Sequence, residues 1–313
     1  MSHDSRIFVA GHRGMVGSAL MRKLEARGYR NLMVRSRAEL DLLNQTAVRS
    51  FLHKEKPDFI FLAAAKVGGI LANSSYPAEF IYQNLAIETN VIDGAYRAGV
   101  ESLLFLGSSC IYPRDCPQPI KEEYLLTGPL EKTNEPYAIA KIAGIKLAES
   151  YNRQYGTRYV SVMPGNLYGP NDNYDLETSH VLPALIARAH RAKLQGDVRF
   201  VIWGSGNAHR EFLHVDDLAD ACVFLMERGI ADGLYNIGVG TDLTIRELAQ
   251  LVLRVAGLNA KLEFDLSRPD GTPRKLLDVS RLRELGWSAN VELAEGVART
   301  YGEYQSQSES VPA

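Results

Sequence analysis

In Ile7-Phe8-Val9-Ala10-Gly11-His12-Arg13-Gly14-Met15-Val16-Gly17, an apolar run leads straight into three glycines spaced three residues apart. The run predicts a short buried strand, and residues 16–27 have the apolar period of a helix that ends at Gly28. Glycines at such a strand-to-helix turn allow a tight turn and the close backbone approach that a dinucleotide pyrophosphate needs at a helix N-terminus. We therefore expect every residue of the loop, 11–17, to contact a nicotinamide cofactor.

Strand and helix alternate through the rest of the first half. Further apolar strands are expected at residues 32–34, 58–62, 103–106 and 159–163, and further helices at residues 48–54, 76–98 and 137–155. This alternation predicts an α/β fold of the Rossmann type, a doubly wound parallel sheet covered by helices on both faces. Ligands bind such sheets beyond the carboxyl ends of the strands, where the motifs described below all lie.

The alternation loosens after Gly165. Glycine, proline and asparagine crowd residues 164–173 and indicate a loop. We therefore predict a cofactor-binding domain of residues 1–170 and a smaller C-terminal α/β substrate lobe of residues 171–313. The two parts are expected to interleave, with the strand near 199–202 as the candidate to rejoin the main sheet. In the lobe, helices are expected near 180–193, 215–228, 244–256 and 291–305, and short strands near 199–202 and 234–237.

Composition limits the class of protein. The 313 residues are 46% apolar and 23% charged, which is typical of a folded globular chain, and the net charge of −2 gives no basic surface for nucleic acid. No apolar run approaches the roughly 20 residues that cross a bilayer, and residues 1–6 lack the apolar segment of a signal peptide. Cys110, Cys116 and Cys222 are too few for a disulfide framework and lack metal spacing. We expect a cytoplasmic protein with no metal and no membrane or nucleic-acid partner.

The end of the second strand indicates which nicotinamide is bound. Sites for NAD usually place an acidic residue there, but this chain has Arg35-Ser36-Arg37, and Arg13 lies inside the glycine loop. Guanidinium groups bind phosphate in a bidentate manner, so the arginines favour the 2′-phosphate of NADP(H). The alternative is that they are solvated surface charge. Asp41 is a candidate acceptor for the adenine amino group.

Two motifs indicate carbonyl reduction. Tyr137 and Lys141 are four residues apart and share one face of a helix. The ammonium is expected to lower the pKa of the phenol, which would deliver a proton to a carbonyl oxygen as hydride arrives. Ser108, at the end of the fourth strand, can hydrogen-bond the same oxygen. With the glycine loop, these residues resemble the extended branch of the short-chain dehydrogenase superfamily, which acts on nucleotide sugars.

Cys110 and His180 are candidates for a second activity. A ketone acidifies the protons on its flanking carbons, so inverting such a carbon takes two titratable groups on opposite faces of the sugar. A thiol near neutral pKa and an imidazole suit this work. The alternatives are a small buried apolar cysteine and an ordinary residue at a helix N-terminus.

Longer motifs resemble one family, the GDP-L-fucose synthases. The resemblance runs over about residues 6–304 and includes these stretches: Ala63-Ala64-Ala65-Lys66-Val67-Gly68-Gly69, Gly107-Ser108-Ser109-Cys110-Ile111-Tyr112-Pro113, Asn134-Glu135-Pro136-Tyr137-Ala138-Ile139-Ala140-Lys141, Arg210-Glu211-Phe212-Leu213-His214-Val215-Asp216-Asp217 and Pro269-Asp270-Gly271-Thr272-Pro273-Arg274-Lys275. It implies an NADPH-dependent enzyme that epimerises C3 and C5 of GDP-4-keto-6-deoxy-D-mannose and reduces C4, giving GDP-L-fucose. One departure is Gly165, where the family more often has threonine.

The resemblance also implies residue roles. Ser108, Tyr137 and Lys141 would carry the reduction, with Cys110 as base and His180 as acid in epimerisation, although the sequence alone does not order the last two. Further cofactor contacts would be Arg37, Ala64, Leu106, Gly107, Ser108, Ser109, Lys141, Pro164, Gly165, Asn166, Leu167 and His180. Substrate contacts would be Arg188, Trp203, Arg210 and Asp270. The two arginines suit a diphosphate, whereas Trp203 could equally pack within the lobe and Asp270 could cap a turn.

The family is homodimeric, so the resemblance implies a four-helix bundle formed by the helices at 76–98 and 137–155. Four other functions stay open. A nucleotide-sugar 4-epimerase would hold NAD tightly, which the arginines oppose. A 4,6-dehydratase would carry Asp-Glu after the strand-four serine, where this chain has Ser109-Cys110. An inactive dinucleotide-binding regulator is opposed by the intact Ser108, Tyr137 and Lys141. A simple 4-ketoreductase would need neither Cys110 nor His180.

Overall fold

The computed structural model describes residues 1–175, 178–268 and 270–309, so Pro269 of the motif quoted above lies outside the described residues. Its main sheet has six parallel strands in the order β10-β5-β4-β3-β1-β2. The strands are β1 (Ile7–Ala10), β2 (Leu32–Met33), β3 (Phe59–Leu62), β4 (Ser102–Leu106), β5 (Arg158–Pro164) and β10 (Leu234–Ile237). After β1 the chain winds first to β2 on one side and then to β3 on the other, which confirms the doubly wound Rossmann-type prediction.

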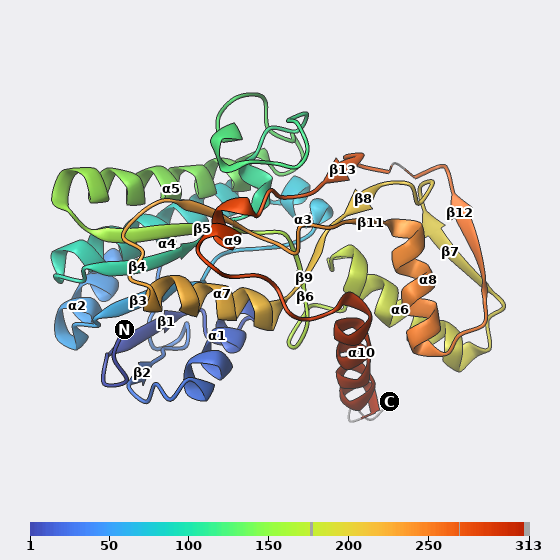
Figure 1. Cartoon of the computed structure of the whole chain (residues 1–313), viewed down its shortest axis with the longest axis horizontal. Coiled ribbons are helices and arrows are strands. Elements are labelled where there is room, and N and C mark those ends of the chain that lie inside the picture. Colours follow the sequence, from blue (N-terminus) through green and yellow to red (C-terminus); the bar gives the residue numbers. More distant parts are fainter. Residues whose placement is uncertain (176–177, 269, 310–313) are drawn as a thin grey trace.

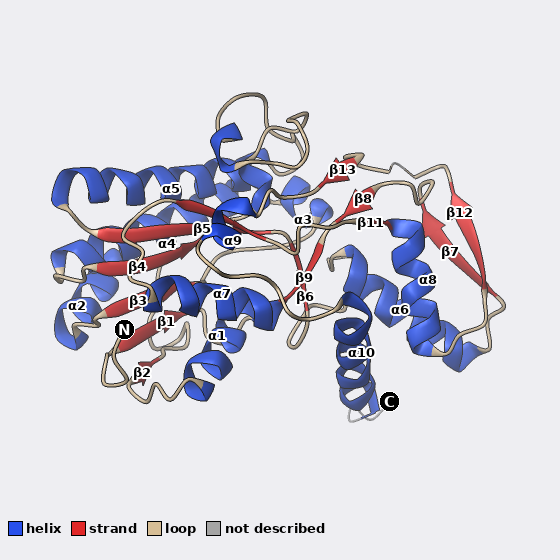
Figure 2. Ribbon diagram, in the orientation of Figure 1, coloured by secondary structure: helices blue, strands red, loops and turns tan. Residues whose placement is uncertain are grey.

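Helices cover both faces of this sheet (Figures 1 and 2). One layer contains α2 (Gln45–Glu55), α4 (Pro77–Arg97) and α5 (Glu135–Tyr155), and the other contains α1 (Met15–Ala26) and α7 (Val215–Glu227). Each layer seals its own apolar core against the sheet. All four residues of β1 are buried, as expected for a strand that is covered on both faces.

The prediction for the strand near 199–202 is wrong in one respect. It forms β7 (Arg199–Trp203) but pairs in parallel with β12 (Lys261–Asp265), away from the main sheet. Exposed and buried residues alternate along β7, whereas the four residues of β10 are all buried. The main sheet is covered by helices on both faces, so its strands need to be apolar on both sides. The fully buried β10 meets this condition, and it rejoins the main sheet beside β5. The α7 helix likewise packs beside α1 on that sheet.

The remaining elements build a third apolar core at the far end of the molecule (Figure 1). Its helices are α6 (Val181–Gln195), α8 (Ile245–Ala256) and α10 (Leu293–Glu309). Two small sheets connect it to the first part: β6 (Asn166–Tyr168) with β9 (Phe212–His214), and β8 (His209–Arg210) between β11 (Leu243–Thr244) and β13 (Arg274–Lys275). Short helices complete the chain: α3 (Ile70–Ser75), η1 (Ser109–Ile111), η2 (Glu122–Tyr124) and α9 (Ser280–Glu284).

No helix within the described residues is long and apolar enough to cross a membrane. The division of the chain near residue 170 stays a prediction.

Candidate active site

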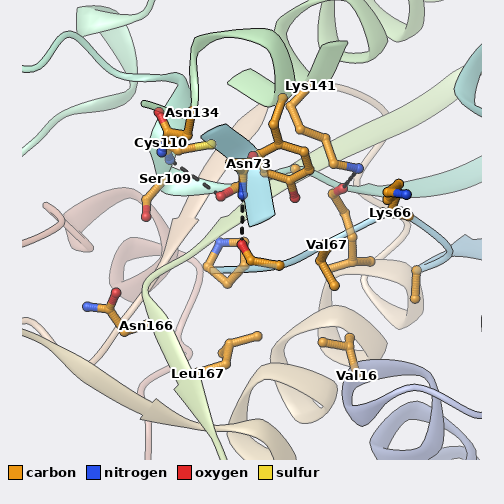
Figure 3. A pocket seen from close by; sticks show the side chains of 18 of the residues that line it. Val16, Lys66, Val67, Asn73, Ser109, Cys110, Asn134, Lys141, Asn166 and Leu167 are labelled. Carbon is orange, nitrogen blue, oxygen red and sulfur yellow. Dashed lines mark hydrogen bonds between the residues drawn. The ribbon is translucent and has the colours of Figure 1, made fainter. Parts of the chain in front are cut away.

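A cavity of about 1250 Å³ lies beyond the carboxyl ends of β1, β3, β4 and β5. Most of the predicted site residues line it: Gly11, Gly14, Met15, Val16, Gly17, Arg37, Asp41, Ala64, Leu106, Gly107, Ser108, Ser109, Cys110, Tyr137, Lys141, Pro164, Gly165, Asn166, Leu167, His180, Arg210 and Asp270. Figure 3 shows Lys141 and Cys110 on one side of it and Val16 and Leu167 on the opposite side. His12, Arg13, Arg188 and Trp203 are not among the lining residues.

The glycine loop forms a cradle that fits a pyrophosphate. Gly14 is the N-cap of α1 and no side chain caps the helix, so its first backbone N–H groups are available to an anion. Gly11 has a φ of +89°, and a Cβ there would lie 2.8 Å from the backbone of Ala64. A Cβ on Gly17 would overlap the carbonyl oxygen of Gly11. The spacing therefore permits the turn and brings α1 against β1.

The two arginines after β2 differ in their contacts. Arg35 forms an ion pair with Glu55 at 3.2 Å and stacks on the ring of Phe51 at 5.1 Å. Arg37 is exposed at the pocket rim and has no ion pair to any residue that the structure describes. Of the two arginines after β2, Arg37 is therefore the one whose guanidinium has no ion pair among the described residues. Asp41 also lines the pocket, and one of its carboxylate oxygens accepts a hydrogen bond from the backbone N–H of Leu43 at 3.1 Å.

Tyr137 and Lys141 lie on the first two turns of α5, which begins at Glu135 with a proline in its first turn. The Nζ of Lys141 donates to the carbonyl of Leu106 at 2.9 Å and lies 5.9 Å from the centroid of the Tyr137 ring. The structure contradicts the expected lowering of the phenol pKa. Burial raises the pKa of Tyr137 well above its usual range, nearby Cys110 and Glu88 add to the rise, and a hydrogen bond with Ser108 opposes it.

Cys110 lies in η1 directly after the end of β4, and its backbone N–H donates to the Ser108 Oγ at 3.4 Å. Burial raises the pKa of the Cys110 thiol, while the charge of Lys275 is the largest of the effects that oppose the rise. His180 is the N-cap residue of α6 and reaches the same pocket. Its pKa is lowered by desolvation in the pocket wall and by Lys275. One lysine thus favours both a thiolate and a neutral imidazole.

The predicted substrate residues fall into two groups. Arg210 and Asp270 line the pocket. Asp270 accepts hydrogen bonds from the backbone N–H of Ser205 at 2.6 Å and from its hydroxyl at 2.8 Å, which joins it to the turn after Trp203. Trp203 itself is 61% exposed, so it does not serve as core packing. Arg188 donates to the carbonyl of Val201 and stacks on Phe200.

Sequence reasoning missed two charged residues at this site. Lys275 lines the pocket at the end of β13, and burial lowers its pKa. Glu88 of α4 is buried directly behind Lys141, at 2.9 Å. Neither has a clear local signal in the sequence, because Arg274 directly precedes Lys275 and Thr89-Asn90 directly follow Glu88. Among the residues described, no three His, Cys, Asp or Glu side chains gather as a metal site.

Comparison with known proteins identifies the family. Residues 7–238 match the NAD dependent epimerase/dehydratase family. The chain is 59% identical over 301 residues to GDP-L-fucose synthase 1 of Arabidopsis thaliana, covering 96% of this chain and 93% of that protein. It is 57% identical over 305 residues to GDP-L-fucose synthase of Escherichia coli (strain K12), covering 95% of each. The chain belongs to the GDP-L-fucose synthase family.

A solved structure of a relative carries the cofactor predicted for this family member. The GDP-mannoheptose C4 reductase MlghC from Campylobacter jejuni, with NADP bound, is 39% identical and superposes with a TM-score of 0.89. The match covers 97% of this chain and 99% of that one. The expectations of a Rossmann-type fold and of an enzyme of the epimerase and oxidoreductase class are confirmed by these likenesses.

Proposed function

We propose that this chain uses NADPH to epimerise C3 and C5 of GDP-4-keto-6-deoxy-D-mannose and to reduce C4, giving GDP-L-fucose. The observation that carries the proposal is one cavity lined by the glycine loop, by Ser108, Tyr137 and Lys141, and by Cys110 and His180. The names of the relatives that share 57–59% of their residues with this chain support the same reaction.

Epimerisation requires a base and an acid on opposite faces of the sugar. We infer that the Cys110 thiolate removes the proton next to the C4 ketone, and the electron pair of the broken C–H bond moves onto the C4 oxygen. Ser108 and Tyr137 stabilise that oxygen by hydrogen bonds. His180 then donates a proton to the opposite face of the carbon, and the carbonyl reforms. Lys275 supports the role of Cys110 as base, because its positive charge favours the thiolate. The same charge lowers the pKa of His180, so the assignment of His180 as acid rests on its place in the pocket and not on its pKa.

Reduction follows at C4. NADPH supplies the hydride when it is bound. Tyr137 donates its proton to the C4 oxygen as the hydride arrives, and the phenol is well suited to this because the raised pKa keeps it protonated. Lys141, on the next turn of α5, is anchored to the Leu106 carbonyl and places its ammonium beside the Tyr137 ring. Arg210, which also lines the pocket, offers a positive charge to the GDP diphosphate.

The proposal is tested by supplying GDP-4-keto-6-deoxy-D-mannose and NADPH, following NADPH oxidation at 340 nm and identifying the sugar by NMR. GDP-L-fucose is the expected product. Tyr137→Phe should lower oxidation by at least about 100-fold while proton exchange at C3 and C5 persists. Exchange lost with oxidation intact would contradict the roles given to these residues.

A simple 4-ketoreductase is the second candidate, since MlghC is named as a C4 reductase of a GDP-sugar. NADPH oxidation that yields an unepimerised 6-deoxyhexose would favour it and would remove Cys110 and His180 from the mechanism.

We also propose a cytoplasmic homodimer that pairs through α4 and α5. These helices pack along each other on one face of the sheet (Figure 1). Their outer side carries exposed apolar and aromatic side chains: Tyr82 is 66%, Ile139 42% and Tyr155 45% exposed. Burying this surface against a second copy would produce a four-helix bundle.

A further inference from the structure

A buried carboxylate lies behind the lysine of the reducing site. The Nζ of Lys141 is 2.9 Å from Oε1 of Glu88, and the two side chains are 2% and 1% exposed. Glu88 comes from α4, whereas Lys141 comes from α5, so the ion pair joins the two helices next to the pocket. The same ammonium donates to the Leu106 carbonyl, which leaves one of its three protons for the pocket.

Neighbouring residues make room for this carboxylate. A Cβ on Gly144 would lie 2.7 Å from Oε2 of Glu88 and 2.5 Å from the ring of Phe105. The Phe105 ring in turn lies 4.6 Å from the Lys141 Nζ. Neither carboxylate oxygen of Glu88 has a hydrogen-bond partner besides the Lys141 ammonium within the part of the chain that the structure describes. Burial raises the pKa of Glu88, and the charge of Lys141 opposes that rise and favours the carboxylate. Lys141 is therefore the group toward which this buried acid is directed.

The pair alters what the lysine does to the phenol. A free ammonium 5.9 Å from the Tyr137 ring would favour the phenolate, which is the form that cannot donate a proton. An ammonium paired with a carboxylate has little net charge, and the carboxylate itself favours the neutral phenol. The titratable or charged groups that face Tyr137 are Glu88 from α4, Lys141 from α5 and Cys110 from η1.

We propose that Glu88 is a positioning residue that holds Lys141 in place and neutralises it, so that Tyr137 stays protonated as the acid of the reducing step. The inference rests on the proposed function in one respect, namely that Tyr137 gives its proton to the C4 oxygen of the keto sugar. A proton donor, and not a proton acceptor, is what carbonyl reduction requires at that oxygen.

The test compares Glu88→Gln with the unaltered chain. Phenolate absorbance near 295 nm is titrated without cofactor or substrate, and the contribution of Tyr137 is isolated by subtracting the same titration of the variant that also carries Tyr137→Phe. Removing the negative charge should shift the Tyr137 titration downward by about one to three pH units. The alkaline limb of the pH profile of NADPH oxidation should move to lower pH by the same amount, while proton exchange at C3 and C5 persists at neutral pH, where the phenol is still protonated.

Asp93→Asn is the matched control. Asp93 is an acid of the same helix that accepts hydrogen bonds from Arg97 and Arg49 at 2.8 Å each and from Tyr151 of α5 at 2.9 Å. The Asp93→Asn variant should leave the Tyr137 titration and the pH profile of NADPH oxidation unchanged. Glu88→Asp keeps the negative charge but lengthens the distance between the carboxylate and the Lys141 Nζ, so it should shift the Tyr137 titration downward by a smaller amount. This variant replaces Glu88→Gln in the test if Glu88→Gln does not fold.

Coincident titrations for Glu88→Gln and the unaltered chain would overturn the inference and leave Glu88 a packing residue. Failure of the proposed function is a different result, because the unaltered chain would then not oxidise NADPH with the GDP-4-keto sugar, while the phenol titration could still be made.

Discussion

Arg37→Ala should weaken NADPH selectively. Arg37 is exposed at the pocket rim, and no described residue forms an ion pair with it, so its guanidinium is available to the 2′-phosphate. A hydrogen bond to a charged group contributes about 1.5 to 3 kcal/mol, and solvent screening of an exposed arginine favours the lower end. A loss of about 1.5 to 2 kcal/mol corresponds to a KM for NADPH that is about 10- to 30-fold higher. NADH lacks the phosphate, so its KM should hardly change.

The assay measures kcat/KM for both cofactors at fixed substrate in Arg37→Ala and in a control, Arg35→Ala. Arg35 already pairs with Glu55 at 3.2 Å, so its loss should cost less than about 1 kcal/mol of stability and leave the preference between cofactors unchanged. Equal losses for NADPH and NADH in Arg37→Ala, or a change of preference in Arg35→Ala, would refute the assignment of the 2′-phosphate to Arg37.

Three further predictions concern the thiol, a buried acid and the assembly. Cys110→Ser should slow deuterium incorporation at C3 and C5 by at least about 100-fold in NMR experiments in D2O, with NADPH affinity unchanged, and normal exchange would remove Cys110 from the mechanism. Burial raises the pKa of Glu211 to about 7, above its unfolded value, so its contribution to the free energy of unfolding is present in acid and declines as pH rises through about 7. Denaturant unfolding at several pH values should therefore show the disadvantage of Glu211→Gln shrinking by about 2 to 3 kcal/mol between pH 5 and 8, and a constant difference would contradict this sign. Tyr82→Glu should convert a dimer of 34.7 kDa chains to monomers in sedimentation velocity, and an unchanged dimer would place the interface elsewhere.

The strands that the first half of the chain gives to the main sheet could be predicted, because most of them are short apolar runs that are buried on both faces. The strand at residues 234–237 is expected in the C-terminal lobe, and the sequence does not predict its place in the main sheet. The sheet to which residues 199–203 belong could not be predicted, because these residues pair with residues 261–265, which lie far away in the sequence. The two-residue strands β8, β11 and β13 carry no periodic pattern at all and form only because their partners are adjacent. Local apolar patterns predict strands, but they do not choose partners.

The same distinction applies to the site. The glycine loop, Ser108 and the Tyr137–Lys141 pair are local motifs, and the cavity brings them together. Lys275 and Glu88 reach the site from distant segments, so spacing gave no warning of them. The error over the pKa of Tyr137 has the same origin, because it depends on burial and on a carboxylate from another helix.

The return of β10 to the main sheet bears on any attempt to shorten the chain. A fragment ending near residue 170 would keep β5 but lose the strand that pairs with it along residues 161–164. Six of the seven residues of β5 are buried in the intact protein, so the fragment would present a bare apolar edge with unpaired backbone groups. Such an edge is a template for intermolecular β-pairing. The cofactor-binding half is therefore expected to aggregate when it is made alone. Residues 215–237 are the later segment to restore, because they contain α7, which covers one face of the sheet, and β10, which covers its edge.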